Sequence, residues 1–136
     1  VFAEMGLYRL RKLWLTGESA GQTEVLLDNL PGFPDNLSHN EGIFWVAIVS
    51  PRDKVADLLA RSPFLAKLAA RLPESLQPAP GRYAAVFGVD GAGEVVHNLQ
   101  DPDGGFATIT AARVNNGYLY LGSLHESAVA RLELYN

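Results

Sequence analysis

Asp35 and Asn36 offer the sharpest chemistry in this sequence, because a carboxylate and an amide stand side by side directly after Pro34. Adjacent carboxylate and amide oxygens suit a hard cation such as calcium, which takes about six to eight oxygen ligands. The same carboxylate could act as a general base or orient a water molecule. The alternative is a structural Asx pair that initiates a turn, and these residues alone leave both interpretations open.

His125 and Glu126 form a second candidate pair, with an imidazole and a carboxylate in one short segment. Such a pair could serve as an acid and a base in catalysis. An exposed loop pair without a catalytic role is the alternative. The strands that surround this segment decide between the two interpretations.

Three look-alike segments supply those elements. The first two are offset by 44 residues and the last two by 75, and a 30-residue insert from Pro51 to Pro80 accounts for the difference. Short strands that repeat at a period of about 40–45 residues are typical of β-propeller blades. The segments are Val1–Gly6 (VFAEMG), Trp45–Ser50 (WVAIVS) and Tyr120–His125 (YLGSLH).

Tight turns within the units support this interpretation. Asn40-Glu-Gly42 and Asn115-Asn-Gly117 follow apolar stretches, and Asn-Gly is a strong hairpin signal because both central residues of a type I′ turn need a positive φ. We expect a four-stranded middle unit, a first unit without its inner strand and a last unit without its outer strand. The expected strands are Val1–Glu4, Arg9–Leu15, Glu24–Leu27, Leu37–His39, Ile43–Val49, Arg82–Val89, Glu94–Leu99, Ala107–Val114, Tyr118–Leu124 and Ala128–Leu134.

The fold class is therefore all-β with a short helical insert, and the chain is expected to be a partial, about three-bladed propeller fragment. The approximate blades are 1–30, 31–100 and 101–136, with the insert at 51–80. Ser62-Pro63 reads as an N-cap followed by proline at the first helical position. Leu65, Leu68, Ala69 and Leu72 form a helical stripe. Two short amphipathic helices follow, acting either as packing on the blade face or, as the topology favours, as a lid.

Antiparallel order decides which residues share a face with Asp35. The start of an inner strand and the end of the second strand lie at the same end of a blade, because the hairpin between them reverses direction. His125 is the histidine expected on that face, since His39 lies beside the opposite hairpin and His97 lies on an outer strand. Asp35 and His125 are thus the candidate catalytic residues. The candidate substrate-lining residues are Glu4, Ser50, Arg52, Thr108, Thr110 and Glu126.

Composition narrows the class of protein. A net charge of −4 argues against a nucleic-acid-binding protein, because binding of nucleic acid depends on clustered Lys and Arg. No apolar run reaches membrane-spanning length. The absence of cysteine excludes a disulfide scaffold and thiol chemistry. The chain opens on Val1 without a visible targeting segment, so its start is expected to lie inside a longer protein and its compartment stays undetermined.

Taken together, several motifs resemble the carboxy-terminal half of strictosidine synthase-like proteins. They are Asp28–Asn36 (DNLPGFPDN), Phe44–Ala47 (FWVA), the helical insert, Leu119–His125 (LYLGSLH) and Tyr8–Trp14 (YRLRKLW), which fits that family's fourth blade. The wider group includes gluconolactonase, or senescence marker protein, and paraoxonase. It implies a six-bladed propeller with calcium in the channel, in which Asp35 and Asn36 match the metal-ligand pair of the fifth blade. The remaining ligands belong to earlier blades outside this sequence.

Two departures from the family pattern shape the expected activity. Thr110 stands where strictosidine synthase carries a catalytic glutamate, and Val49 stands where paraoxonase carries a functional histidine. The resemblance then implies a calcium-dependent hydrolase of lactones or esters, in which calcium polarises a carbonyl while a carboxylate manages the water. One alternative is a non-catalytic propeller that binds a small apolar ligand or a partner. Another is a strictosidine synthase-type carbon–nitrogen lyase.

The expected partners follow from the incomplete ring. Unpaired sheet edges are templates for pairing, and propellers avoid them by closing. We expect this chain to associate with itself or with the missing half of its propeller, and its substrate to be a small molecule. Nucleic acid and membranes are not expected partners.

Overall fold

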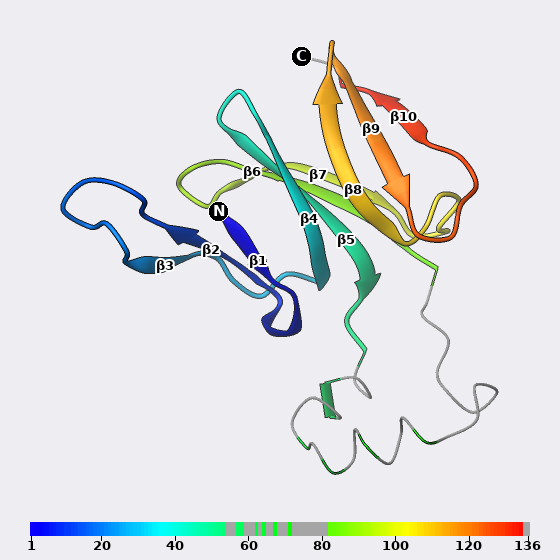
Figure 1. The fold of residues 1–136 in the computed structure, drawn as a ribbon. Coiled ribbons are helices and arrows are strands. Elements are labelled where there is room, and N and C mark those ends of the chain that lie inside the picture. Colours follow the sequence, from blue (N-terminus) through cyan, green and yellow to red (C-terminus); the bar gives the residue numbers. More distant parts are fainter. Residues whose placement is uncertain are drawn as a thin grey trace.

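The computed structural model describes residues 1–53, 57, 58, 62, 64, 67, 71 and 82–134. Within them, ten strands form three antiparallel sheets (Figure 1). The first sheet has the order β1-β2-β3, the second β4-β5-β6-β7 and the third β10-β9-β8. The strands are β1 (Phe2–Glu4), β2 (Arg9–Leu13), β3 (Thr23–Leu27), β4 (Gly32–Asn40), β5 (Ile43–Pro51), β6 (Ala84–Val89), β7 (Val95–Asp101), β8 (Ile109–Asn115), β9 (Tyr118–Ser123) and β10 (Ala130–Glu133).

These sheets are three blades of a β-propeller, as the repeat predicts. The second sheet has the four strands of a complete blade, and the first and third sheets have three strands each. One short 3₁₀ helix, η1 (Met5–Leu7), connects β1 to β2 and was not expected. Tyr8, which caps this helix, has a left-handed φ of 52° that its sequence does not signal.

The two central strands of the middle blade, β5 and β6, are buried on both faces, because this blade lies between its two neighbours. Side chains alternate along a strand, so β5 directs Val46 and Ile48 into one cluster of buried residues and Trp45 and Ala47 into another. The first cluster joins the middle blade to Leu10 of the first, and the second joins it to Leu119 of the third. This double burial explains why β5 and β6 read as continuous apolar runs.

The predicted hairpins are confirmed where the inner strands turn. Glu41 and Gly42 have φ values of 49° and 82°, and Asn116 and Gly117 have φ values of 48° and 76°. Both pairs therefore have the positive φ values of type I′ turns, whose twist matches the flanking strands.

The helical insert falls largely outside the described residues, and so do its predicted stripe and proline cap. Asp57, Leu58, Phe64 and Lys67 are described, and they have helical geometry. Asp57 and Leu58 form a short helical piece on the side of the blades where β5 ends (Figure 1). Among the described residues, no helix is long and apolar enough to span a membrane.

Candidate functional site

One end of the blades collects most of the residues that the sequence singles out. The end of β1, the start of β4, the end of β5 and the start of β8 all lie at the lower end in Figure 1. Ser50 pairs with Phe33 across β4 and β5, and Ser123 pairs with Ile109 across β8 and β9. Glu4, at the end of β1, lies at the same end. We call this end of the blades the site face.

A bulge in β4 sets the position of Asp35 and Asn36. Pro34 pairs with Ile48 and Leu37 pairs with Val46, so Asp35 and Asn36 together oppose a single residue of β5. The sequence placed them at the start of an inner strand, but β4 already begins at Gly32. Proline is tolerated inside a strand at a bulge, where its missing N–H breaks no ladder hydrogen bond. Bulges re-aim side chains and recur beside active sites.

The third blade repeats this irregularity at the equivalent position. Ile109 pairs with Ser123 and Ala111 pairs with Gly122, so the register shifts at Thr110. Thr110 follows Asp35 by 75 residues, which is the offset of the repeat itself. The two inner strands therefore present corresponding bulges at the site face, one carrying a carboxylate and the other a hydroxyl.

Side-chain hydrogen bonds join these inner strands and fix the amide of Asn36. Its Nδ2 donates to the carbonyl oxygen of Thr110 at 2.8 Å. Two residues further along, the Ser38 hydroxyl donates to the carbonyl oxygen of Ala112 at 2.6 Å. With the amide nitrogen engaged, the Oδ1 atom of Asn36 is the one available to a ligand.

The carboxylate of Asp35 is half-buried, and burial raises its pKa above the ordinary aspartate value. Within the part of the chain that the structure describes, it has no hydrogen bond or ion pair. A desolvated carboxylate without a partner is unfavourable unless a cation or donor compensates it. Asp35 and Asn36 thus offer a carboxylate and an amide oxygen of the type that calcium prefers. Among residues 1–53 and 82–134, no group of three acidic or histidine side chains completes a metal site.

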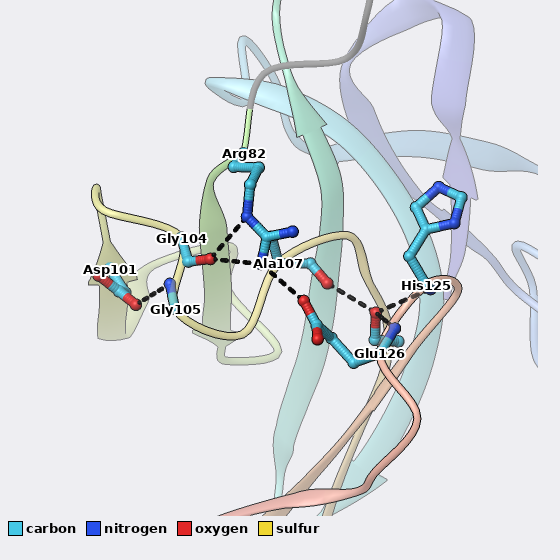
Figure 2. A network of polar contacts seen from close by, with 8 residues as sticks. Arg82, Asp101, Gly104, Gly105, Ala107, His125 and Glu126 are labelled. Atoms are coloured by element: carbon cyan, nitrogen blue, oxygen red, sulfur yellow. Dashed lines mark hydrogen bonds and ion pairs between the residues drawn. The ribbon is translucent and has the colours of Figure 1, made fainter.

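The carboxylate of Glu126 forms an ion pair with Arg82. Arg82 holds the Glu126 carboxylate at 2.7 Å and also donates to the carbonyl oxygen of Gly104 at 3.0 Å (Figure 2). This hydrogen bond lowers the pKa of Glu126 below its usual value. The His125 imidazole points away from the ion pair in Figure 2. Glu126 therefore ties the third blade to the segment that leads into β6, and the predicted roles of His125 in catalysis and of Glu126 in lining the site stay predictions.

Ser123 holds the loop that carries these two residues. Its hydroxyl donates to the carbonyl oxygen of Ala107 at 2.6 Å and accepts the backbone N–H groups of His125 and Glu126 at 3.1 and 3.2 Å. The loop is thereby fixed to the segment that leads into β8. Thr108 in that segment has a φ of 55°, which is unfavourable for a β-branched residue.

Two more of the expected lining residues are engaged in internal contacts. Glu4 accepts a hydrogen bond from Arg9 and lies 3.7 Å from Arg11. Arg52 donates from Nε to the carbonyl oxygen of Leu30 at 2.7 Å, and its guanidinium lies 4.2 Å from the centre of the Tyr8 ring. The contacts of Glu4 lie within the first blade, whereas those of Arg52 join the second blade to the first.

Tyr8 also lies at the site face, although its sequence context did not predict a role in the site. Its hydroxyl bonds to the carboxylate of Asp57, and its ring lies 4.7 Å from that of Phe33. Burial, followed by the bond to Asp57, raises the pKa of Tyr8 to about 12. Tyr8 therefore connects the insert to the first blade. No sequence signal could pair two residues that lie 49 positions apart.

The sequence of this chain is similar to those of several known proteins. The chain is 34% identical over 142 residues to strictosidine synthase-like 3 of Arabidopsis thaliana, covering 98% of this chain and 36% of that protein. It is 38% identical over 110 residues to strictosidine synthase-like 13 of the same plant, covering 76% of this chain and 27% of that protein. The chain belongs to the strictosidine synthase-like family. No family model matches it.

An animal relative extends the similarity within this family. The chain is 33% identical over 140 residues to the adipocyte plasma membrane-associated protein of Rattus norvegicus, covering 97% of this chain and 37% of that protein. The chain thus spans between about a quarter and a little over a third of the length of these curated relatives.

Proposed function

We propose that this chain contributes to a calcium-dependent hydrolase of lactones or esters. The observation that carries the proposal is the half-buried, unpaired carboxylate of Asp35 beside the oriented Oδ1 of Asn36 at a strand bulge. Both atoms are hard oxygen donors, and burial makes the free carboxylate costly without a cation. Bound calcium would polarise the carbonyl of the substrate. Further ligands would come from the other blades.

The residues of this chain have separate parts in that scheme. Asp35 would hold the cation and orient the attacking water. Asn36 supplies a second oxygen, and the carbonyl of Thr110 keeps its amide in the required orientation. The side chain of Thr110 cannot supply the acid–base function of a glutamate, because a hydroxyl does not ionise near neutral pH. For this reason a hydrolase fits this chain better than a strictosidine synthase-type lyase.

The test is the calcium dependence of turnover by the full-length protein. Phenyl acetate and dihydrocoumarin represent aryl esters and lactones, and their hydrolysis should rise with calcium and disappear on chelation with EGTA. Calcium binding without turnover of either substrate class would favour the alternative, a non-catalytic propeller that binds a ligand or partner. Turnover that persists in EGTA would contradict the proposal.

The open sheet edges lead to a separate proposal about association. In the described structure β1 pairs only with β2, and β10 pairs only with β9. Phe2 and Leu132, on these edge strands, are 37% and 41% exposed. Because free edges with apolar side chains favour strand pairing, the isolated 136-residue chain should self-associate or bind the remaining blades. Light scattering at micromolar concentration checks this, and a folded 14.7 kDa monomer would contradict it.

A further inference from the structure

A pocket lies between the second and third blades, at the end opposite the site face. Its volume is about 500 Å³, and the two equivalent hairpins border it with Asn40, Glu41, Asn115 and Asn116. Asn40 is the last residue of β4, five positions after Asp35. At about 3.3 Å per residue, the two sites are about 17 Å apart. The pocket is therefore distinct from the proposed metal site.

An aromatic platform forms part of this pocket. Trp45, Gly88 and His97 pair directly across β5, β6 and β7, so they form one row across the sheet. The indole and imidazole rings stack over the glycine, with their centres 4.8 Å apart and an interplanar angle of 26°. Trp45 is only 2% exposed, whereas His97 is half-buried. The imidazole is therefore the accessible part of the platform.

Gly88 makes room for this stack. A Cβ atom at this position would lie 2.9 Å from Cδ2 of His97 and 3.1 Å from Cγ2 of Ile43. Real Cβ contacts are longer than the first of these distances, so any larger residue would displace the imidazole. The absence of a side chain at Gly88 is thus what allows the two rings to meet.

The polar rim is fixed by backbone geometry. Glu41 and Asn116 occupy left-handed positions of the two type I′ turns, with φ values of 49° and 48°. The N–H of Leu134 donates to the carbonyl oxygen of Gly117 at 2.9 Å, which holds the second turn against the end of the third blade. The backbone that carries the rim residues is thereby held in place before any ligand arrives, which lowers the entropy that binding must overcome.

The chemistry of the rim selects the ligand class. The three asparagine amides can both donate and accept hydrogen bonds, and Glu41 accepts them. None of the described residues that line the pocket is a Lys or Arg. Arg113 lines the adjoining pocket, which shares Asn40 and Asn115, so within this pocket an anionic ligand would meet the carboxylate of Glu41 without a cation in the lining. Hydroxyl groups match amides and a carboxylate, and the C–H face of a sugar ring matches an aromatic surface. We infer that this pocket binds a polyhydroxyl ligand, a saccharide or a related polyol, with its ring against His97.

Titration of the full-length protein with glucose, galactose, N-acetylglucosamine and sucrose tests this inference. At least one of these probes should bind with a Kd below about 10 mM. Glu41→Gln and Asn115→Ala should each weaken that binding about tenfold, the usual scale for a lost hydrogen bond to a charged or buried polar group. Saturation-transfer NMR should show contact through the ring protons of the sugar.

Matched variants separate the pocket from general effects. Gly88→Ala should displace His97 and weaken binding, whereas Gly91→Ala should not, because a Cβ there meets nothing within 4 Å. Glu18→Gln removes a carboxylate from an exposed loop and should leave binding unchanged, as should Asp35→Ala at the other face. Absence of binding for all four sugars up to about 50 mM would overturn the inference. Binding that Glu41→Gln leaves unchanged would overturn it as well.

Discussion

Replacing Trp45 with alanine should lower the free energy of unfolding of the full-length protein by about 3–5 kcal/mol, the usual range for a buried large aromatic residue. Trp45 is 2% exposed and belongs to the cluster that joins the second and third blades. Its loss would open a cavity between two sheets and remove the surface on which His97 stacks. Urea unfolding followed by circular dichroism measures the change.

Trp14 provides the matched control for this variant. It is 41% exposed, and its ring has a cation–π contact with Lys12, whose ammonium lies 4.7 Å from the ring centre. An exposed contact of this kind contributes about 0.5–1 kcal/mol, so Trp14→Ala should be several-fold milder than Trp45→Ala. Equal losses for the two variants would show that Trp45 is not a core residue of the assembled propeller.

Most of the fold could be predicted from the sequence because the repeat and the turns are local signals. Both central residues of a type I′ turn need positive φ values, which glycine adopts readily, and the structure has them at both predicted hairpins. The alternation of Trp45 and Ala47 with Val46 and Ile48 also follows from the period of a strand. Both signals depend on neighbours in the chain, which is why they survive without knowledge of the tertiary structure.

The parts of the site that could not be predicted depend on contacts between distant segments. The ion pair of Glu126 with Arg82 spans 44 residues, and the bond from Asn36 to Thr110 spans 74. No local sequence pattern indicates which partner Glu126 or Asn36 contacts. The bulge at Asp35 has a similar origin, because it arises from the register of β4 on β5 and not from a turn after Pro34.

Asp35 itself leads to the prediction with the greatest functional consequence. Asp35→Ala should weaken calcium binding to the full-length protein by more than about 100-fold, since changes to groups that only orient metal ligands already cost about 10–100-fold. Calcium-dependent turnover should be lost with it. Calcium should raise the melting temperature of the parent protein, because a ligand that binds only the folded state stabilises it. It should leave the melting temperature of the variant unchanged.

The pH dependence gives this prediction a second measurement. Calcium needs the ionised carboxylate, and the raised pKa of Asp35 makes its affinity fall, on acidification, at a higher pH than for an ordinary aspartate. In the absence of calcium, acidification has the opposite effect, because it favours the folded state instead of weakening a bound ligand. A half-buried position favours the protonated carboxyl of Asp35. Its contribution to folding stability therefore becomes unfavourable as the pH rises from the pKa of Asp35 in the unfolded state through its raised pKa in the folded state. Above that range, Asp35→Asn should be at least as stable as the calcium-free parent.

Asp103→Ala is the matched control, because it removes an exposed carboxylate from the loop before β8. It should leave calcium affinity, its pH profile and turnover unchanged. If Asp35→Ala were unfolded, Asp35→Asn would still test the site, since it keeps the shape of the side chain and removes only the charge. Calcium affinity retained by a folded Asp35→Asn variant would place the metal ligand elsewhere, and the bulge in β4 would then be a structural feature of the blade alone.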